Sequence, residues 1–63
     1  MWSVIWKNDK GIYTAFTNVI FETEKKATEF KIAQKSMRKK HDCRAVKYDY
    51  KYFNGVTENE IDR

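Results

Sequence analysis

The first third of the chain alternates apolar and polar residues with the period of two that is typical of β-strands. Over residues 2–7, one side of the strand carries Trp2, Val4 and Trp6. Residues 12–22 are similarly rich in β-branched and aromatic side chains, which favour extended backbone. The pattern therefore predicts two strands near the amino terminus.

A short loop separates these two strands. Residues 8–11 read Asn-Asp-Lys-Gly, a run of turn-forming residues that ends in a glycine. We expect a hairpin in which Gly11 takes a positive φ, because glycine adopts that conformation without steric cost. A reversal at residues 9–10 pairs Trp6 with Tyr13 and Val4 with Ala15.

Residues 24–41 lack glycine and proline and are rich in good helix formers, so they predict an α-helix. Thr23 is a suitable N-cap for it. Apolar and weakly polar residues recur at three- and four-residue intervals, as expected for an inward-facing stripe. This stripe comprises Ala27, Phe30, Ala33, Gln34, Met37 and His41.

Alternation returns after the helix. Over residues 44–53 every second residue, from Val46 through Tyr48 and Tyr50 to Tyr52, lies on one side. This alternation predicts a third strand, which ends at Asn54-Gly55. Together these elements predict an α+β domain over residues 1–55, with a three-stranded sheet and one helix packed on one face, in the order β-β-α-β. Residues 56–63 are polar and acidic, and we expect them to form a loose tail.

One helix covers only one face of such a sheet. Uninterrupted alternation assigns to the covered face Trp2, Val4, Trp6, Tyr13, Val19, Phe21, Val46, Tyr48 and Tyr50. The other face then carries Ile5, Phe16 and Ile20, an apolar patch of the kind that marks interfaces. The patch favours a partner protein or a homodimer, although cover by residues 56–63 or harmless exposure are alternatives.

Charge is concentrated in the middle of the chain. The net charge is +4, but residues 23–53 hold ten Lys and Arg against four Asp and Glu, which gives +6 for that segment. On a helical wheel most of these cations face outward around a single isoleucine, which favours an acidic partner. The predicted binding residues are Lys25, Lys31, Ile32, Lys35, Arg38 and Lys39.

The sequence contains little that points to chemistry. Cys43 is the only cysteine and His41 the only histidine, so one chain lacks both a disulfide and the ligands of a structural zinc site. We expect Cys43 to enter the core as a small apolar residue rather than to act as a nucleophile with His41 as its base. No phosphate-binding loop or catalytic motif is present. We therefore expect no enzyme activity and no cofactor.

The function predicted from the sequence is binding. The longest apolar run is far shorter than the ~20 residues that cross a bilayer, and we expect a cytoplasmic protein without membrane association. Small size, lysine richness and absence of proline are typical of bacteriophage accessory proteins, although no motif supports that comparison. We expect an inhibitor or adaptor that docks on an acidic host protein; the alternative is nonspecific binding of nucleic acid by the basic helix.

Overall fold

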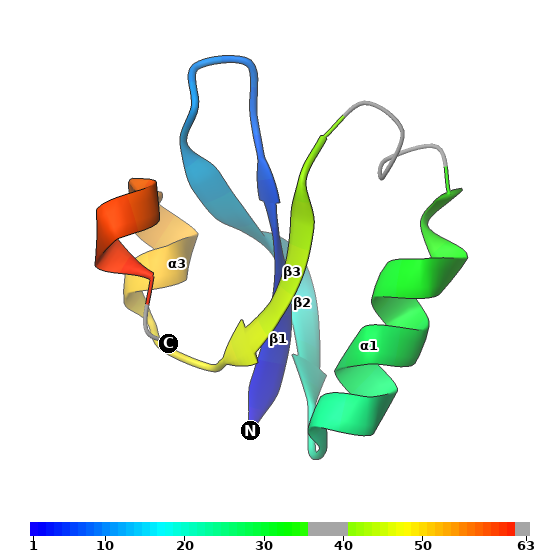
Figure 1. Cartoon of the computed structure of the whole chain (residues 1–63). Coiled ribbons are helices and arrows are strands. Elements are labelled where there is room, and N and C mark those ends of the chain that lie inside the picture. Colours follow the sequence, from blue (N-terminus) through cyan, green and yellow to red (C-terminus); the bar gives the residue numbers. More distant parts are fainter. Residues whose placement is uncertain (36–40, 62–63) are drawn as a thin grey trace.

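The computed structural model describes residues 1–35 and 41–61, and for residues 17–19 it describes the backbone only. The chain is a small α+β domain (Figure 1). Its elements are strand β1 (Trp2–Lys7), strand β2 (Tyr13–Phe21), helix α1 (Glu24–Ala33), strand β3 (Cys43–Lys47), helix α3 (Lys51–Asn54) and the 3-10 turn η1 (Glu58–Glu60).

The three strands form one antiparallel sheet in the order β2-β1-β3. Because β1 lies in the centre and runs opposite to both neighbours, β2 and β3 are parallel to each other and α1 connects them. An isolated antiparallel bridge between Tyr13 and Val56 extends the outer edge of β2, so that four segments of the chain contribute to the sheet. The predicted architecture of three strands and one helix is close to this fold, but it lacks α3, η1 and the bridge at Val56.

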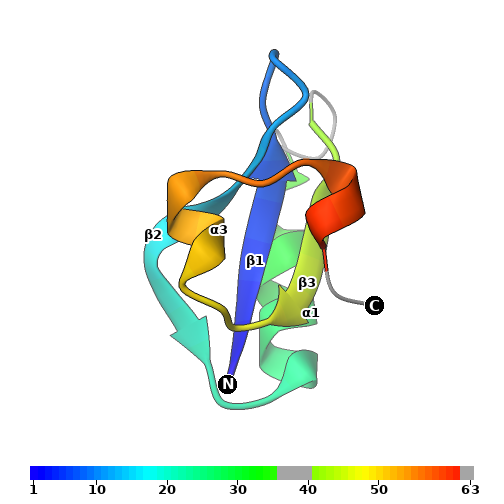
Figure 2. The same ribbon diagram turned by 90° about the vertical axis from the view of Figure 1, so that its left-hand side faces the viewer.

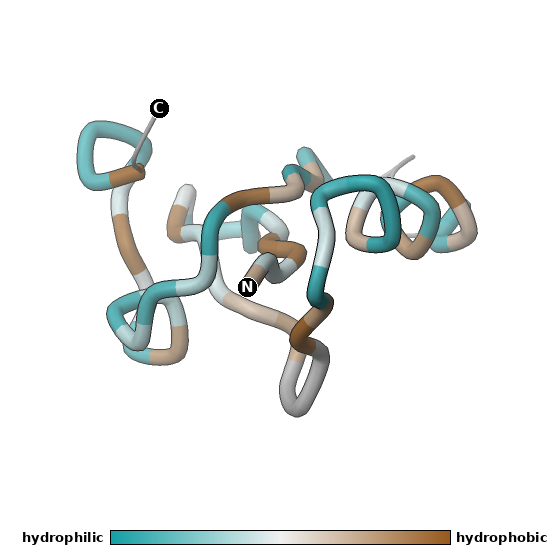
Figure 3. Tube along the Cα trace, turned by 90° about the horizontal axis from the view of Figure 1, so that it is seen from below, coloured by the Kyte–Doolittle hydropathy of each residue, from teal (hydrophilic) through white to brown (hydrophobic). Residues whose placement is uncertain are grey.

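Two layers enclose the sheet. Helix α1 packs on one face, and the C-terminal segment 48–61 lies on the other, as the views from the front and from below show (Figures 1 and 3). Within that segment, α3 lies in front of β2 and η1 lies beside β3 (Figure 2). The buried core on this second face comprises Ile5, Tyr13, Val46, Tyr52, Val56 and Ile61. A chain of 63 residues therefore covers both faces of its sheet.

The predicted hairpin is present, but its register is shifted by one residue. Trp6 pairs with Thr14 rather than with Tyr13, which lies opposite Lys7. The reason lies in the loop, where the Asn8 side chain accepts hydrogen bonds from the backbone N–H of Lys10 and of Ile12. This lengthens the loop by one residue and moves Tyr13 to the face that the C-terminal segment covers. Gly11 has the expected positive φ, at 80°.

The shifted register also corrects the predicted position of Phe16, and an irregularity in β2 then keeps Phe21 on the helix face. Between the pairs formed by Ser3 and Ile5, β1 has one residue, whereas β2 has residues 16–19. Such a bulge inverts the alternation of side chains along the strand. Phe16 and Phe21 consequently share the α1 face, where their ring centroids lie 5.5 and 5.3 Å from that of Phe30.

Helix α1 begins as predicted and ends early. The Thr23 side chain accepts a hydrogen bond from the Lys26 N–H, and Ala27 is fully buried against the sheet. The helix ends at Ala33, because Gln34 leaves helical geometry with a ψ of 60°. Ala33 is exposed rather than inward-facing, and the predicted stripe position Met37 lies outside the described residues.

Strand β3 ends at Lys47, so the predicted strand over residues 44–53 is wrong in its second half. The Asp49 carboxylate accepts the Lys51 N–H, and the Asp49 carbonyl accepts the Tyr52 N–H. These bonds satisfy the free N–H donors at the start of α3 and thereby favour a helical turn after β3. Helix α3 then ends at Gly55, whose φ is 87°.

The C-terminal segment is ordered through residue 61, which differs from the loose tail expected for residues 56–63. Val56 exchanges both backbone hydrogen bonds with Tyr13, at 2.8 and 2.9 Å. Thr57 and Glu60 then form a capping box around η1, and Ile61 is buried. The polar residues of this segment face outward, while Val56 and Ile61 anchor it; residues 62–63 lie outside the described part of the chain.

We predict that Ile61→Ala lowers the free energy of unfolding by about 2–3 kcal/mol, because it leaves a cavity under the C-terminal segment. Urea unfolding followed by tryptophan fluorescence measures the change. The exposed neighbour Asn59 provides a control, since Asn59→Ala should change stability by less than about 0.5 kcal/mol. Equal stability of the two variants would mean that Ile61 does not anchor the segment.

Candidate binding surfaces

The outward side of α1 carries part of the predicted basic surface. Lys25 and Ile32 are seven residues apart and share this side of the helix, and Ile32 is 50% exposed. Lys26 is also exposed and flanks them. Glu29 lies between Lys25 and Ile32, so one acidic side chain offsets part of the positive charge.

The continuous row of lysines expected along one long helix is not observed. Lys31 is half-buried, because it shares the sheet-facing half of α1 with Ala27. Lys35 is exposed, but it follows the break at Gln34 and is not aligned with Lys31 along one helix axis. Arg38 and Lys39 lie outside the described residues. We define the helix surface as Lys25, Ile32 and Lys35.

Within residues 1–35 and 41–61, neither lysine of the helix surface forms an ion pair with a carboxylate of the chain. The ion pairs there join Arg44 to Asp42 and to Glu58, and neither Lys25 nor Lys35 takes part. Its cations therefore remain available to a partner.

The apolar patch predicted from Ile5, Phe16 and Ile20 does not exist as one exposed surface. Ile5 is fully buried beneath the C-terminal segment, and Phe16 packs against α1. Ile20 is exposed at the sheet edge, on the face of the C-terminal segment. The segment that was expected to be loose covers this face. The shifted hairpin register places Phe16 on the opposite face from Ile5, and the bulge in β2 places it on the opposite face from Ile20.

An exposed aromatic cluster, which sequence reasoning did not identify, lies where the chain leaves β3. It consists of Met1, Tyr48, Tyr50 and Phe53, and we call it the aromatic cluster. The Phe53 ring centroid lies 5.9 Å from that of Tyr48 and 5.9 Å from that of Tyr50. The Tyr48 N–H donates to the Met1 carbonyl, which holds the backbone of the exposed Met1 next to that of Tyr48.

The alternation of residues 44–53 hid this cluster, since it assigned Tyr48 and Tyr50 to the core. Two local signals pointed to the observed structure. Asp49 is a favourable residue at a helix start, and Asn54-Gly55 is a favourable helix end. Read together, they predict a short helix instead of a strand.

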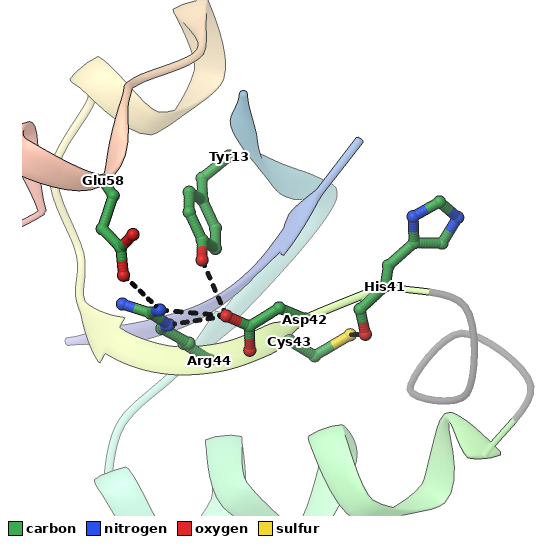
Figure 4. Close-up of polar contacts among 6 residues, drawn as sticks. All are labelled: Tyr13, His41, Asp42, Cys43, Arg44 and Glu58. Carbon is green, nitrogen blue, oxygen red and sulfur yellow. Dashed lines mark hydrogen bonds and ion pairs between the residues drawn. The ribbon is translucent and has the colours of Figure 1, made fainter. Parts of the chain in front are cut away.

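A polar network joins three parts of the second face (Figure 4). The Tyr13 hydroxyl donates to the Asp42 carboxylate at 2.7 Å. The same oxygen of Asp42 accepts from Nε and Nη2 of Arg44, and Nη2 also donates to Glu58 at 2.7 Å. The Arg44 guanidinium lies 4.9 Å from the centre of the Tyr13 ring. The network links β2, the start of β3 and η1.

These contacts shift the acid–base properties of the network. Burial, followed by the hydrogen bond to Asp42, raises the pKa of Tyr13 from 10.0 to about 12. The hydrogen bond from Tyr13 and, against the effect of burial, those from Arg44 lower the pKa of Asp42. The bonds to Glu58 and Asp42 raise the pKa of Arg44. All three groups thus keep their usual charge near neutral pH, as expected for a structural network.

His41 and Cys43 do not form a nucleophile–base pair in the structure. The Cys43 thiol is buried and lies 3.9 Å from the backbone carbonyl of His41, while the imidazole ring lies away from the thiol (Figure 4). That ring instead packs edge-on against Trp6, with centroids 4.8 Å apart. Among the described residues, no group of three or more His, Cys, Asp and Glu is placed to hold a metal ion.

Comparison with known proteins adds no relative to this description. The chain matches no protein-family model, no curated protein and no solved structure. None of the helices in the described part of the chain has the length and apolar character needed to cross a membrane.

We predict that Tyr13→Phe lowers the free energy of unfolding by about 1.5 kcal/mol, because it removes a hydrogen bond to a charged group and retains the buried ring. Tyr48→Phe is the matched control, since the exposed Tyr48 has no comparable bond among the described residues. Denaturant unfolding at neutral pH measures both variants.

Alkaline titration provides a separate prediction. A pKa raised on folding means that the stability contributed by Tyr13 is complete below pH 10.0 and is lost as the pH rises towards about 12. In an ultraviolet absorbance titration of the folded protein, Tyr13 should contribute a late phase of tyrosinate absorbance near pH 12, and Tyr13→Phe should remove this phase. A late phase that persists in the variant would contradict the assignment.

Proposed function

We propose that the chain is a non-catalytic binding protein, an inhibitor or adaptor that docks on an acidic protein surface through the helix surface. One observation carries the proposal: Ile32 is 50% exposed on α1 beside Lys25 and ahead of Lys35. An exposed apolar side chain with a lysine before it and another after it resembles the usual anatomy of an interface, with an apolar centre and a charged rim.

Charge supports an acidic partner. From residue 24 to residue 35 the chain carries four lysines against two glutamates, an excess of two positive charges. Long-range attraction by such an excess accelerates encounter with a surface of opposite sign, while the apolar centre slows dissociation.

A pull-down from a nuclease-treated extract of the source cells tests the proposal. We predict that Lys25→Glu and Ile32→Glu each weaken capture of the partner at least about tenfold, or about 1.4 kcal/mol. Lys10→Glu is the matched control, because it makes the same change of charge in the exposed hairpin loop. Capture that is unchanged by Lys25→Glu, or equally reduced by Lys10→Glu, would contradict docking through α1.

A substitution at Glu29 should change binding in the opposite direction. Because its carboxylate lies between Lys25 and Ile32, Glu29→Gln should strengthen binding to an acidic partner. The nucleic-acid alternative makes a different prediction: binding disappears with nuclease, and the purified protein shifts DNA or RNA at low salt. That affinity would fall steeply between about 50 and 200 mM salt as phosphate contacts are screened.

A further inference from the structure

We propose that the outer edge of strand β3 is a second binding surface, and that its occupant is β3 of a second copy of this chain. The two strands would pair in antiparallel fashion about a two-fold axis and join the two sheets into one. This edge is distinct from the helix surface on α1, so the pairing does not depend on the proposed function.

The hydrogen bonds to β1 determine which backbone groups of β3 face outward. The Lys7 N–H donates to the Asp42 carbonyl, and the Tyr48 N–H donates to the Met1 carbonyl, so the even-numbered residues of this segment bond to β1. Residues that bond to one neighbouring strand alternate along an antiparallel strand. The N–H and C=O groups that point away from β1 are therefore those of Cys43, Ala45 and Lys47.

The edge of β3 is regular and open. Strand β3 pairs with β1 at five consecutive positions without a bulge, whereas the bridge to Val56 already occupies part of the β2 edge. Figure 1 views β3 from its edge, and no described segment passes in front of it. Within residues 1–35 and 41–61, no backbone hydrogen bond joins Ala45 or Lys47 to a segment other than β1. Such an edge is a template for a further strand.

The outward residues are arranged symmetrically, which fits a second copy. In a pair centred on Ala45, that residue lies opposite the partner's Ala45, and Cys43 lies opposite the partner's Lys47. This register pairs all the outward residues of β3 with one another and forms up to about six backbone hydrogen bonds. It also places Arg44 opposite the partner's Val46, so no two like charges lie directly opposite. A register centred on Arg44 would oppose two guanidinium groups.

Charge does not oppose this pairing, although the whole chain is basic. The positive excess lies in residues 1–40, which hold nine Lys and Arg against four Asp and Glu. Residues 41–61, which include β3, hold three Lys and Arg against four Asp and Glu, a net charge of −1. Arg44 is also paired with Asp42 and Glu58, which reduces its repulsion of the partner's Arg44 on the diagonal.

A dimer of this kind would present two helix surfaces together. The two-fold axis of an antiparallel strand pair runs perpendicular to the sheet, so both copies of α1 lie on the same face of the joined sheet. Two linked sites on one face raise the effective concentration for a partner with repeated acidic surfaces. This consequence rests on the proposed function, whereas the strand pairing does not.

Sedimentation velocity of the purified chain over a range of concentrations tests the pairing. A species of twice 7.6 kDa should form as the concentration rises. Ala45→Pro should raise the dissociation constant of this dimer at least about tenfold, because proline cannot donate and the lost N–H faces outward. Ala15→Pro is the matched control, since Ala15 turns its N–H to the outer edge of β2. Circular dichroism shows whether each variant folds.

Disulfide cross-linking tests the register without requiring a proline to be tolerated. In a Cys43→Ala background, Ala45→Cys should form an intermolecular disulfide, because directly opposite Cα atoms of a bonded pair lie about 5.5 Å apart. Lys47→Cys in the same background is the matched control. The two copies of that position are four residues out of register, so they should stay unlinked.

Three results would overturn the proposal: a monomer at every concentration, a dimer that a folded Ala45→Pro variant retains, or equal cross-linking of Ala45→Cys and Lys47→Cys. Dissociation of a dimer by Ile32→Glu but not by Ala45→Pro would assign the contact to the helix surface instead. If Ala45→Pro does not fold, the cross-linking result decides. Both experiments use the purified chain alone, so their failure is distinct from a failure to capture an acidic partner.

Discussion

The contacts of Tyr13 are the constraint on which the rest of the structure depends. This residue is fully buried, exchanges two backbone hydrogen bonds with Val56, and donates its hydroxyl to Asp42. It thereby holds the C-terminal segment against the edge of β2 and ties β2 to the start of β3 across the central strand. A domain of this size buries only about 60% of the surface of its unfolded chain, so losing one of its two layers would leave little core.

The elements that the sequence could predict are those that local patterns determine. The start of α1 and the positive φ of Gly11 depend on local patterns, and these predictions were correct. Phe21 also lies against the helix as predicted, but only because the bulge in β2 offsets the shifted register. The register of the hairpin depended on whether the Asn8 side chain lengthened the loop. Alternation does not settle it here, because residues 12–16 carry apolar or aromatic side chains on both sides, so a one-residue shift still buries one set of them.

The prediction for residues 44–53 failed for a related reason. Tyr52 is buried in the structure, as it would have been in a strand, so the apolar pattern alone cannot distinguish the two conformations. The difference comes from hydrogen bonding, since Asp49 offers the backbone a helix start and Gly55 permits its end. The helix surface was recognised in part because an outward face follows from helical periodicity, whereas the aromatic cluster required knowledge of where β3 ends.

The same event that completes the core creates the exposed rings. Once the chain turns at Asp49 so that Tyr52 enters the second layer, neighbouring residues of a short helix necessarily point elsewhere, and Phe53 meets Tyr48 and Tyr50 at the surface. The buried cluster of the second face consists of other residues, so the packing of Phe53 against Tyr48 and Tyr50 is confined to the surface. The helix surface and residues 48–54 lie on opposite sides of the sheet, so the turn that ends β3 early also decides which side chains this side of the molecule exposes.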